Sequence, residues 1–359
     1  MKIVKVRLGQ NSYSIDIGVG ILNQTGQMLK ELGLNEKAVI ITNPVVQKLY
    51  GELVYQSLVA AGYKTTVLEV PDGEAYKSLE SAGKLYQQLA EFGAERSTPV
   101  LALGGGVIGD LAGFVAATYM RGVPFIQLPT TLLAQVDSSI GGKTAVNHGQ
   151  LKNEIGAFYQ PRITISDIAT LKTLPPAELI SGLAEVIKHA VIKDEQFFIY
   201  LEQNLDRIKA LDDNVLETIV MKCAQIKAEI VENDEKDMAS RNILNFGHTV
   251  GHAVEAVSNF QVAHGQAVAV GMVAAAKIAA ELDLMDAVNV TGLERILQKA
   301  GLMTRLPKME INRVIQTMRY DKKVRNDKIR FVLPRSIGQV FITDDVSSTV
   351  VEKVLREML

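Results

Sequence analysis

Hydrophobic and polar positions alternate along the first hundred residues in the manner of a protein that interleaves strands and helices. Residues 2–7 and 13–17 show the period-two alternation of a strand hairpin. Residues 38–42 and 64–70 are apolar runs of the kind that fills a parallel sheet, and a helical pattern follows each of them. This alternation of strands with helices predicts an α/β fold with a parallel sheet.

The segment at residues 100–153 carries the first chemical signal. Its apolar residues 100–103 predict a buried strand, its three glycines, Gly104 to Gly106, predict a turn without side chains, and residues 107–117 predict a helix. Such a turn directs unpaired N–H groups and the positive end of the helix dipole at one point, which suits a pyrophosphate. The alternative is a turn that only lets the helix pack closely on the strand, and the turn by itself does not choose between the two.

The spacing of Gly104, Gly106 and Gly109 fits the pattern G-x-G-x-x-G but not its usual setting. The ordinary dinucleotide fingerprint occupies the first strand–helix turn and has an acid about twenty residues later. Here the turn comes late in the chain, and the following strand, predicted at residues 124–128, ends in Pro-Thr-Thr. We therefore predict a nucleotide site of a different design.

Residues 135–144, Gln-Val-Asp-Ser-Ser-Ile-Gly-Gly-Lys-Thr, resemble a phosphate-binding P-loop in composition only. The first glycine of G-x-x-x-x-G-K-[ST] is missing, so an NTPase is the weaker interpretation. The segment is expected to be a polar loop, and Lys152 and Asn153 follow it shortly. So many small and ionic groups between apolar segments favour a binding loop over an ordinary solvated one.

The pattern changes from alternating to helical after the strand predicted at residues 162–166. Residues 171–309 are helical in pattern, and two prolines, Pro175 and Pro176, mark a helix start. A small hairpin and a last helix complete the chain, at residues 328–333, 339–343 and 347–358. We expect an N-terminal Rossmann-like α/β domain, residues 1–171, and a mainly α-helical domain, residues 172–359.

Composition narrows the class of protein without identifying it. The 359 residues are 47% hydrophobic and 22% charged, which is typical of a globular protein and not of a disordered or fibrous one. A net charge of −2 provides no broad basic surface, so neither nucleic acid nor an anionic membrane is an expected partner. No signal peptide is visible, and the single cysteine, Cys223, fits a reducing compartment, so we expect a cytoplasmic protein with a buried thiol.

Four of the five histidines lie in the helical half, close to acids. They and their neighbours form three patches: Glu185 with Lys188 and His189 at the spacing of one helix face, His248 with His252 four residues apart, and His264 at a predicted helix start. Catalytic zinc takes three nitrogen or carboxylate ligands and keeps one position open. These patches therefore predict a metal site, although isolated histidines are usually structural and the pattern does not select the ligands.

A further patch is basic and contains Lys222, Lys227, Arg241 and the segment Tyr-Asp-Lys-Lys-Val-Arg at residues 320–325. Solvated helix faces would explain the same residues. In a nearly neutral protein, a local group of lysines and an arginine also suits a small anionic ligand.

Six motifs occur in an order that resembles the 3-dehydroquinate synthase family over almost the whole chain. They are GGGVIGDLAGF, PTTLLAQVDSSIGGKTAVN, LKN, GLAEVIKH, LNFGHTVGHAVE and HGQAVAVGM. The wider family of sugar-phosphate cyclases shares many of them. The resemblance implies an N-terminal NAD-binding domain, a C-terminal helical domain, a homodimer, and zinc or cobalt held by Glu185, His248 and His264, with His252 at the substrate.

The resemblance also assigns the other site residues one by one. NAD would contact a set at the strand ends and in the polar loop: Asn43, Asp72, Glu74, Lys77, Gly105, Gly106, Val107, Asp110, Thr130, Thr131, Asp137, Ser138, Lys143 and Lys152. The substrate would contact a mainly basic set, with Arg121 reaching in from the partner subunit: Lys143, Lys152, Asn153, Lys188, Lys227, Arg241, Asn245, His252 and Lys322. The run Asp-Met-Ala-Ser-Arg that starts at Asp237 departs from the family's pattern, which leaves an acidic role for Asp237 open.

The implied reaction is that of a lyase in the shikimate pathway of aromatic amino acid biosynthesis. It converts 3-deoxy-D-arabino-heptulosonate 7-phosphate into 3-dehydroquinate and phosphate by transient oxidation with NAD, β-elimination of phosphate, re-reduction and intramolecular aldol closure. Three alternatives are a cyclase for another sugar phosphate such as sedoheptulose 7-phosphate, an alcohol dehydrogenase of the glycerol dehydrogenase type, and a non-catalytic NAD-binding scaffold. The candidate carboxylate-binding residues argue against the first, the dehydrogenase would release NADH, and the convergence of metal and anion groups argues against the scaffold.

Overall fold

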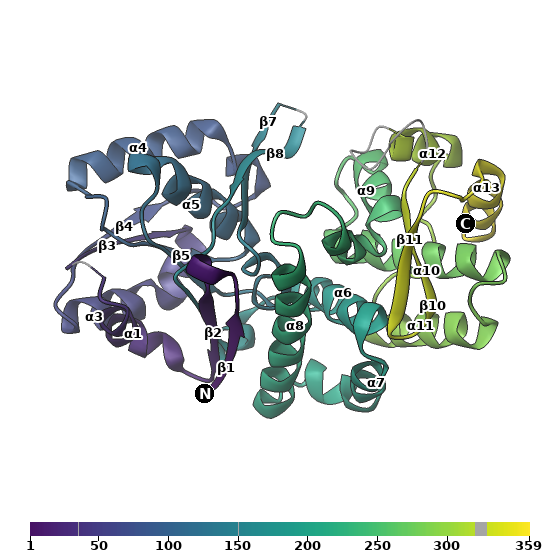
Figure 1. The fold of residues 1–359 in the computed structure, drawn as a ribbon, viewed down its shortest axis with the longest axis horizontal. Coiled ribbons are helices and arrows are strands. Elements are labelled where there is room, and N and C mark those ends of the chain that lie inside the picture. The colour runs from purple at the N-terminus through teal and green to yellow at the C-terminus, as the bar shows by residue number, and fades with distance from the viewer. Residues whose placement is uncertain (35, 150, 320–328) are drawn as a thin grey trace. The chain divides into compact units, whose positions relative to one another are not determined.

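The computed structural model describes residues 1–359 except 35, 150 and 320–328, and it divides into two compact units (Figure 1). The first unit comprises Met1–Leu174 and Asp213–Lys236, and the second comprises Pro175–Asp212 and Asp237–Leu359. The chain therefore passes between the units three times. Residues Asp213–Lys236 come after the first segment of the second unit in the sequence, but they belong to the first unit.

The first unit is built on a seven-stranded sheet of order β1-β2-β9-β6-β5-β3-β4. Its strands are β1 (Lys2–Val6), β2 (Tyr13–Gly18), β3 (Lys37–Thr42), β4 (Lys64–Glu69), β5 (Val100–Gly104), β6 (Phe125–Pro129) and β9 (Ile163–Asp167). β1 and β2 form the antiparallel hairpin that the sequence predicts, and the other pairs in the sheet are parallel. The α/β prediction for this half of the chain is confirmed.

Helices cover both faces of this sheet, which explains the continuous apolar runs of its central strands. Along β5, Val100 and Ala102 pack in one hydrophobic cluster with α4 (Leu79–Phe92) and α5 (Gly106–Thr118). Leu101 and Leu103 point the other way and pack with α1 (Thr25–Glu31) and α3 (Glu52–Ala60). Figure 1 shows these two helix pairs on opposite sides of β3 and β4. The long helix α8 (Asp213–Asn233) packs on β1 and β2.

The strand order reverses beside β5. The chain runs from β3 to β4 at one edge of the sheet and then returns to the other side of β3 to form β5 and β6. In an open parallel sheet, ligands bind beyond the carboxyl ends of the strands at such a reversal. Asn43 follows β3 at this point, and the glycine turn follows β5.

The expected polar loop is the main difference from the sequence prediction in this unit. Residues 134–158 contain a π-helical turn, η6 (Ala134–Ser138), and an antiparallel hairpin of β7 (Lys143–His148) and β8 (Leu151–Phe158). The loop prediction for residues 135–144 is therefore wrong at the π-helical turn and at Lys143 and Thr144, and the hairpin itself was not predicted. The strand pattern is weak because along β7 only Thr144 and Val146 are buried, and one of them is polar.

Short helical turns connect the elements of the first unit. They are η1 (Gly9–Asn11), η2 (Ile21–Gln24), α2 (Pro44–Val46), η3 (Gln47–Gly51), η4 (Glu74–Tyr76), η5 (Tyr119–Arg121) and η7 (Ile168–Thr173). Ser78 caps α4 by accepting a hydrogen bond from the N–H of Ser81 at 3.2 Å, as expected for a serine before a helix. In η5, Met120 and Arg121 have φ angles of 48° and 65°, which are unfavourable for residues with side chains.

The second unit is mainly α-helical, as predicted. Its elements are α6 (Pro176–Lys193), α7 (Glu195–Lys209), η8 (Ser240–Asn245), α9 (His248–Val257), α10 (His264–Glu281), α11 (Ala287–Ala300), α12 (Ile311–Arg319), β10 (Phe331–Ser336), β11 (Gln339–Thr343) and α13 (Ser348–Glu357). The helix start at Pro176, the late hairpin and the last helix confirm the sequence prediction. Helix α12 lies beyond the helical region that the sequence predicts.

α10 is the central helix of the second unit, and it packs against α6, α9, α11, α13 and β10. Glycines allow backbones to approach each other at two points along it. A Cβ on Gly271 would lie 1.8 Å from the carbonyl oxygen of Gly247, and a Cβ on Gly265 would lie 2.3 Å from that of Ser181. Since glycine lacks this atom, α10 lies directly on the backbone of α6 and of the turn before α9.

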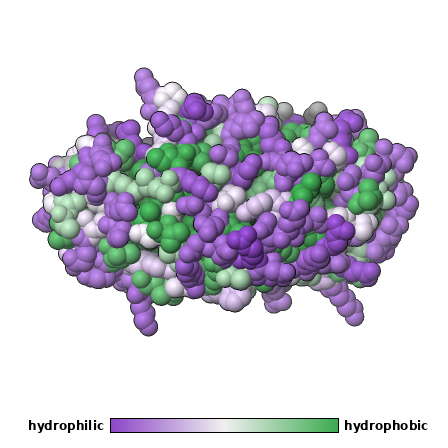
Figure 2. Space-filling model, turned by 90° about the horizontal axis from the view of Figure 1, so that it is seen from below, coloured by the Kyte–Doolittle hydropathy of each residue, from purple (hydrophilic) through white to green (hydrophobic). Residues whose placement is uncertain are grey.

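The surface and the interior divide as expected for this composition. Hydrophilic residues cover most of the face shown in Figure 2, with hydrophobic residues scattered among them. Cys223 is buried in α8, as predicted. Among the described residues, no helix combines the length and the hydrophobicity that a bilayer crossing requires.

We expect Gly271→Ala to lower the free energy of unfolding by about 1–3 kcal/mol, because the new methyl group overlaps the backbone of Gly247 and neither backbone is free to move. Gly292→Ala is the matched control, since a Cβ there meets nothing within 4 Å and lies in helix α11, where alanine stabilises by roughly 0.5–1 kcal/mol. Urea unfolding of the two variants measures both changes. Equal stabilities would show that α9 and α10 are not packed as closely as described.

Candidate active site

The glycine turn after β5 lies against residues from two later segments. A Cβ on Gly105 would be 3.0 Å from Thr131 Cγ2, and a Cβ on Gly106 would be 3.0 Å from Ser138 Oγ. The N–H of Thr130 donates to the carbonyl oxygen of Gly104 at 3.0 Å. The N-terminus of the 13-residue helix α5 therefore lies beside Thr131 and Ser138 without a side chain of its own, which suits a bound pyrophosphate.

Asn43 connects the ends of the neighbouring strands β3 and β4. Its side-chain Nδ2 donates to Asp72 Oδ1 at 2.7 Å, and its side-chain Oδ1 accepts from the N–H of Val46 at 2.8 Å. Both residues belong to the set predicted to bind NAD. The structure thus places them on adjacent strand ends beside the reversal of strand order, where a nucleotide is expected.

Lys77 forms hydrogen bonds with one residue predicted to bind NAD and with one residue predicted to bind the substrate. Its Nζ donates to Asp110 Oδ2 and to Asn153 Oδ1, each at 2.5 Å, and its side chain is 5% exposed. Burial raises the pKa of the Asp110 carboxyl, and the Lys77 ammonium acts in the opposite direction. Asn153 is held with a φ of 58°, a left-handed conformation that asparagine tolerates better than most residues.

A second network ties the β7–β8 hairpin to the turn at Glu74. The side chain of Asn147 donates to Glu74 Oε1 at 2.9 Å and accepts from the N–H of Asn153 at 3.0 Å. Lys152 Nζ lies 3.8 Å from the same glutamate oxygen. The hairpin therefore holds Lys152 and Asn153 at the predicted NAD residues, and the NAD and substrate sets share contacts within the first unit.

Lys227, on α8, belongs with these residues rather than with the helical half in which it was grouped by sequence. Its Nζ donates to the carbonyl oxygen of Asp137 at 2.6 Å and to Asp137 Oδ1 at 2.8 Å. The side chain is 7% exposed, so its charge is removed from water and paired. This is the second contact in the first unit between a residue predicted to bind the substrate and a residue predicted to bind NAD.

In the second unit, Glu185, His248 and His264 converge although they come from α6, α9 and α10. One potential ligand atom from each lies within 4.8 Å of the others. Glu185 Oε1 is 3.3 Å from His264 Nε2 and 3.6 Å from His248 Nε2, and the Glu185 side chain is completely buried. His252 lies outside this group and is exposed, and its ring meets that of His248 edge-on with 5.2 Å between centroids. The spacing of residues in the sequence did not decide between His252 and His264, and in the fold it is His264 that lies with Glu185 and His248.

In both His248 and His264, the ring nitrogen Nδ1, which is not the one nearest Glu185, has a protein partner. His248 Nδ1 is 3.1 Å from the carbonyl oxygen of Phe246, and His264 Nδ1 is 3.4 Å from a carboxylate oxygen of Glu255. A partner at Nδ1 holds the proton there and leaves the Nε2 lone pair directed at the ligand position. Two imidazole nitrogens and one carboxylate oxygen, oriented in this way, fit zinc or cobalt with an open coordination position.

The two histidines differ in their affinity for protons. Burial and the positive charge of Lys188 hold the pKa of His248 well below its usual value, so this ring is neutral. Burial also lowers the pKa of His264, but its hydrogen bonds to Glu185 and Glu255 outweigh burial and raise that pKa to about 10. A divalent cation at Nε2 of His264 would therefore compete with a proton for the same lone pair.

The remaining predicted residues are distributed over both units. Lys188 is buried and contacts the Glu185 carboxylate, and Arg241, on η8, is 2% exposed. Asn245 ends η8, and Arg121 is exposed in the strained turn η5. Val107 lies in the first turn of α5, and Lys143 is exposed at the start of β7. Lys322 and the rest of the basic segment at 320–325 lie outside the described residues.

Two residues of these networks were missed by the sequence analysis. Asn147 bridges Glu74 and Asn153, and Glu255 contacts His264. Glu255 follows His248 by seven residues, or about two helical turns, so both side chains lie on the same face of α9. That spacing was available in the sequence, whereas the contacts of Asn147 depend on a hairpin that the sequence did not predict.

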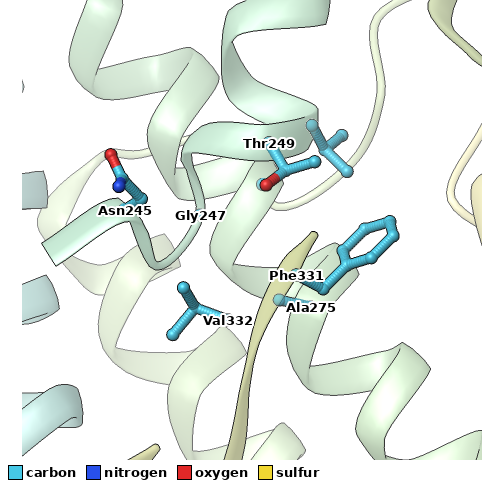
Figure 3. A pocket seen from close by; sticks show the side chains of 8 residues that line it. Asn245, Gly247, Thr249, Ala275, Phe331 and Val332 are labelled. Carbon is cyan, nitrogen blue, oxygen red and sulfur yellow. The ribbon is translucent and has the colours of Figure 1, made fainter. Parts of the chain in front are cut away.

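A small cavity lies near these residues in the second unit. Asn245, Gly247, Thr249, Ala275, Phe331 and Val332 line it, as Figure 3 shows. Its volume is about 10 Å³, which is enough for a single water molecule at most. Thr249 Oγ1 donates to the carbonyl oxygen of Arg330 at 3.2 Å. The cavity is too small for a sugar phosphate, so we assign it to packing rather than to chemistry.

A doubly wound sheet with a glycine turn at its reversal, followed by a helical unit that gathers one carboxylate and two imidazoles, is the arrangement of two-domain enzymes that combine a nucleotide with a metal. The chain belongs to the 3-dehydroquinate synthase family. The family's N-terminal domain, described as "3-dehydroquinate synthase N-terminal", matches residues 67–181, and its C-terminal domain, "3-dehydroquinate synthase C-terminal", matches residues 182–324.

Individual proteins agree with this assignment. A protein of Desulforamulus reducens named 3-dehydroquinate synthase is 49% identical over 99% of this chain and all of its own length. The solved structure of 2-deoxy-scyllo-inosose synthase with carbaglucose-6-phosphate, NAD+ and Co2+ has a TM-score of 0.91, 26% identity and full coverage of both chains. ValA, a 2-epi-5-epi-valiolone synthase from Streptomyces hygroscopicus with NAD+ and Zn2+ bound, has a TM-score of 0.89 and 25% identity over 100% of this chain and 99% of its own.

We expect His264→Ala to lose bound metal and His252→Ala to retain it, because His264 and not His252 lies with Glu185 and His248. Removing one of three ligands leaves too few protein donors for tight binding. Metal analysis of both variants after dialysis is the measurement. Full metal content in His264→Ala together with loss in His252→Ala would identify the histidine pair of α9 as the ligands instead.

Proposed function

We propose that this chain is a lyase that converts 3-deoxy-D-arabino-heptulosonate 7-phosphate into 3-dehydroquinate and phosphate, with NAD and zinc or cobalt as cofactors. The observation that carries the proposal is the convergence of Glu185, His248 and His264 in a chain that is 49% identical, over 99% of its length, to a protein named 3-dehydroquinate synthase. Two structures of similar fold contain NAD+ together with Co2+ or Zn2+, which supports the same pair of cofactors here.

The residues proposed to hold the cofactors lie in different units. NAD would bind at the carboxyl ends of β3 and β5, where the amides of α5 suit its pyrophosphate. The metal would bind to Glu185, His248 and His264 in the helical unit. When bound, NAD supplies a reversible hydride acceptor, and the metal supplies a Lewis acid for a substrate hydroxyl and the ketone derived from it.

The substrate carries a phosphate and a carboxylate, and the chain offers buried cations for both. Lys188, Lys227 and Arg241 are each less than 10% exposed. The planar guanidinium of arginine can bind a carboxylate through two parallel hydrogen bonds, whereas a lysine acts as a point charge. We assign these three residues, with Lys143, Lys152, Asn153 and Asn245, to the substrate anions and hydroxyls. A carboxylate-binding set favours the heptulosonate over sedoheptulose 7-phosphate, which lacks that group.

The elimination and the ring closure need fewer protein groups than the recognition of the substrate does. A ketone acidifies the neighbouring C–H bond, so the carbon–oxygen bond to phosphate breaks as that proton leaves, and a phosphate oxygen of the substrate can accept the proton. We propose that His252, which is exposed and lies beside His248, exchanges protons between the site and solvent. The other residues hold the substrate and exclude water while the ring opens and closes again by aldol addition.

We also propose a cytoplasmic homodimer. The exposed Arg121 sits in a turn where two successive residues with side chains have positive φ angles. Strain of this kind is retained where a side chain has to be presented in one direction, often at a functional site. Presentation of Arg121 to the site of a partner subunit would explain it.

We expect phosphate release from the heptulosonate phosphate to require metal and NAD while NADH does not accumulate. The hydride taken from the substrate has to be returned, because aldol closure follows re-reduction at the same carbon. Substrate deuterated at C5 should therefore give product that keeps the label. Phosphate assay with and without chelator, absorbance at the NADH band and mass spectrometry of the product measure the three quantities.

The alternatives give different results in the same assays. An alcohol dehydrogenase would release one NADH per turnover or lose the label to solvent. A cyclase for another sugar phosphate would release phosphate from sedoheptulose 7-phosphate and not from the heptulosonate. Either result would contradict the proposed reaction.

We expect Arg241→Lys to lower kcat/KM by roughly ten- to a hundredfold with little change in NAD affinity, because charge-assisted bonds to an anion contribute about 1.5–3 kcal/mol. The lysine keeps the positive charge but not the paired N–H groups. Arg295→Lys is the control, since Arg295 forms an exposed ion pair with Glu202 at 2.8 Å. An equal loss of NAD affinity would place Arg241 at the cofactor instead of the substrate.

A further inference from the structure

Glu255 is a buried acid that contacts one of the proposed metal ligands from behind. It lies on α9, its side chain is 8% exposed, and both of its carboxylate oxygens are 3.4 Å from His264 Nδ1. A carboxylate at this depth is costly unless it pairs with a donor or a charge. The contact is made on the side of the imidazole ring that faces away from Glu185, which is 3.3 Å from Nε2.

The two histidines of the cluster are held in different ways. His248 Nδ1 meets a neutral group, the carbonyl oxygen of Phe246, whereas His264 Nδ1 meets a carboxylate. A carboxylate that accepts the Nδ1–H bond fixes the tautomer, orients the ring and makes Nε2 a stronger donor to a metal. His264 is also the more exposed of the two ligands, with 33% of its side chain accessible against 12% for His248. His264, the more exposed ligand, is therefore held by the stronger hydrogen-bond acceptor, a carboxylate.

The charges of the cluster give Glu255 a second effect. Lys188 pairs with Glu185 on α6, so the positive charge of one offsets the negative charge of the other. Glu255 then adds a second carboxylate next to the ligand His264. In a buried site such a charge is poorly screened, and it favours the binding of a divalent cation.

We propose that Glu255 is a positioning residue for the metal centre: its carboxylate accepts the Nδ1–H of His264, directs Nε2 at the metal and raises the affinity of the centre for a divalent cation. This inference rests on the proposed metal site. It gives α9 a double role, because the same face of this helix carries the ligand His248 and, about two turns later, the group that orients the ligand of α10.

Two variants separate the two effects. Glu255→Gln keeps an oxygen that can accept from Nδ1 but removes the charge, and Glu255→Ala removes both. Glu294→Gln is the matched control, since it removes a carboxylate of the same unit that pairs with Lys277 at 3.0 Å on the surface of α11. Competition with a chromophoric chelator measures the zinc dissociation constant of each variant, and the visible absorption of the cobalt-loaded protein reports the ligand geometry.

We expect zinc affinity to fall in the order wild type, Glu255→Gln, Glu255→Ala, with a total loss of about 10- to 100-fold, and Glu294→Gln to match wild type. The cobalt bands of Glu255→Ala should shift, since His264 is no longer held in place. A role limited to folding would change the melting temperature of the apoprotein and leave zinc affinity and the cobalt bands of the folded variants unchanged. If Glu255→Ala does not fold, the nearly isosteric Glu255→Gln decides the question.

Wild-type zinc affinity in both Glu255 variants would overturn this inference while leaving the proposed reaction intact, since phosphate release by the wild-type enzyme is measured separately. A wild-type protein that releases phosphate from the heptulosonate without binding zinc or cobalt would overturn both the metal site and the role of Glu255.

Discussion

The candidate metal centre depends on how closely three backbone segments approach one another around α10. Gly271 of α10 lies on the carbonyl group of Gly247, and Gly265 lies on the backbone of α6 at Ser181. Gly265 directly follows the proposed ligand His264, and Gly271 lies about two helical turns further along α10. A side chain at either position would push the helices apart. The three ligand atoms come from three different helices and lie within 4.8 Å of one another, and contacts without a Cβ let these helices approach so closely.

Buried charge is the second constraint, and both units satisfy it by pairing a lysine with an acid. In the first unit Lys77 meets Asp110 and Lys227 meets Asp137, and in the second Lys188 meets Glu185. Each pair consists of residues expected to touch a cofactor or the substrate. Charges kept out of water without a partner are expensive, so these pairs hold the side chains in place and leave a site whose charge balance changes when an anion or a cation enters.

The sequence predicted most of the architecture because its strongest signals are local. The apolar runs of β3 and β5 and the helix start at Pro176 follow from residues that are close in the chain. The β7–β8 hairpin was missed because its buried positions include Thr144, and residue spacing alone did not favour His264 over His252. Which histidine joins Glu185 depends on packing between helices far apart in sequence, and only the family resemblance or the fold supplies that information.

The division of the first unit into two segments has a consequence for how the chain folds. Helix α8 packs on β1 and β2, yet 38 residues of the second unit, Pro175–Asp212, are made before it. During synthesis the sheet can assemble from Met1–Leu174, but the face at β1 stays uncovered until Asp213–Lys236 has left the ribosome. By then the first two helices of the second unit have already emerged, so neither unit completes its hydrophobic core before synthesis of the other has begun.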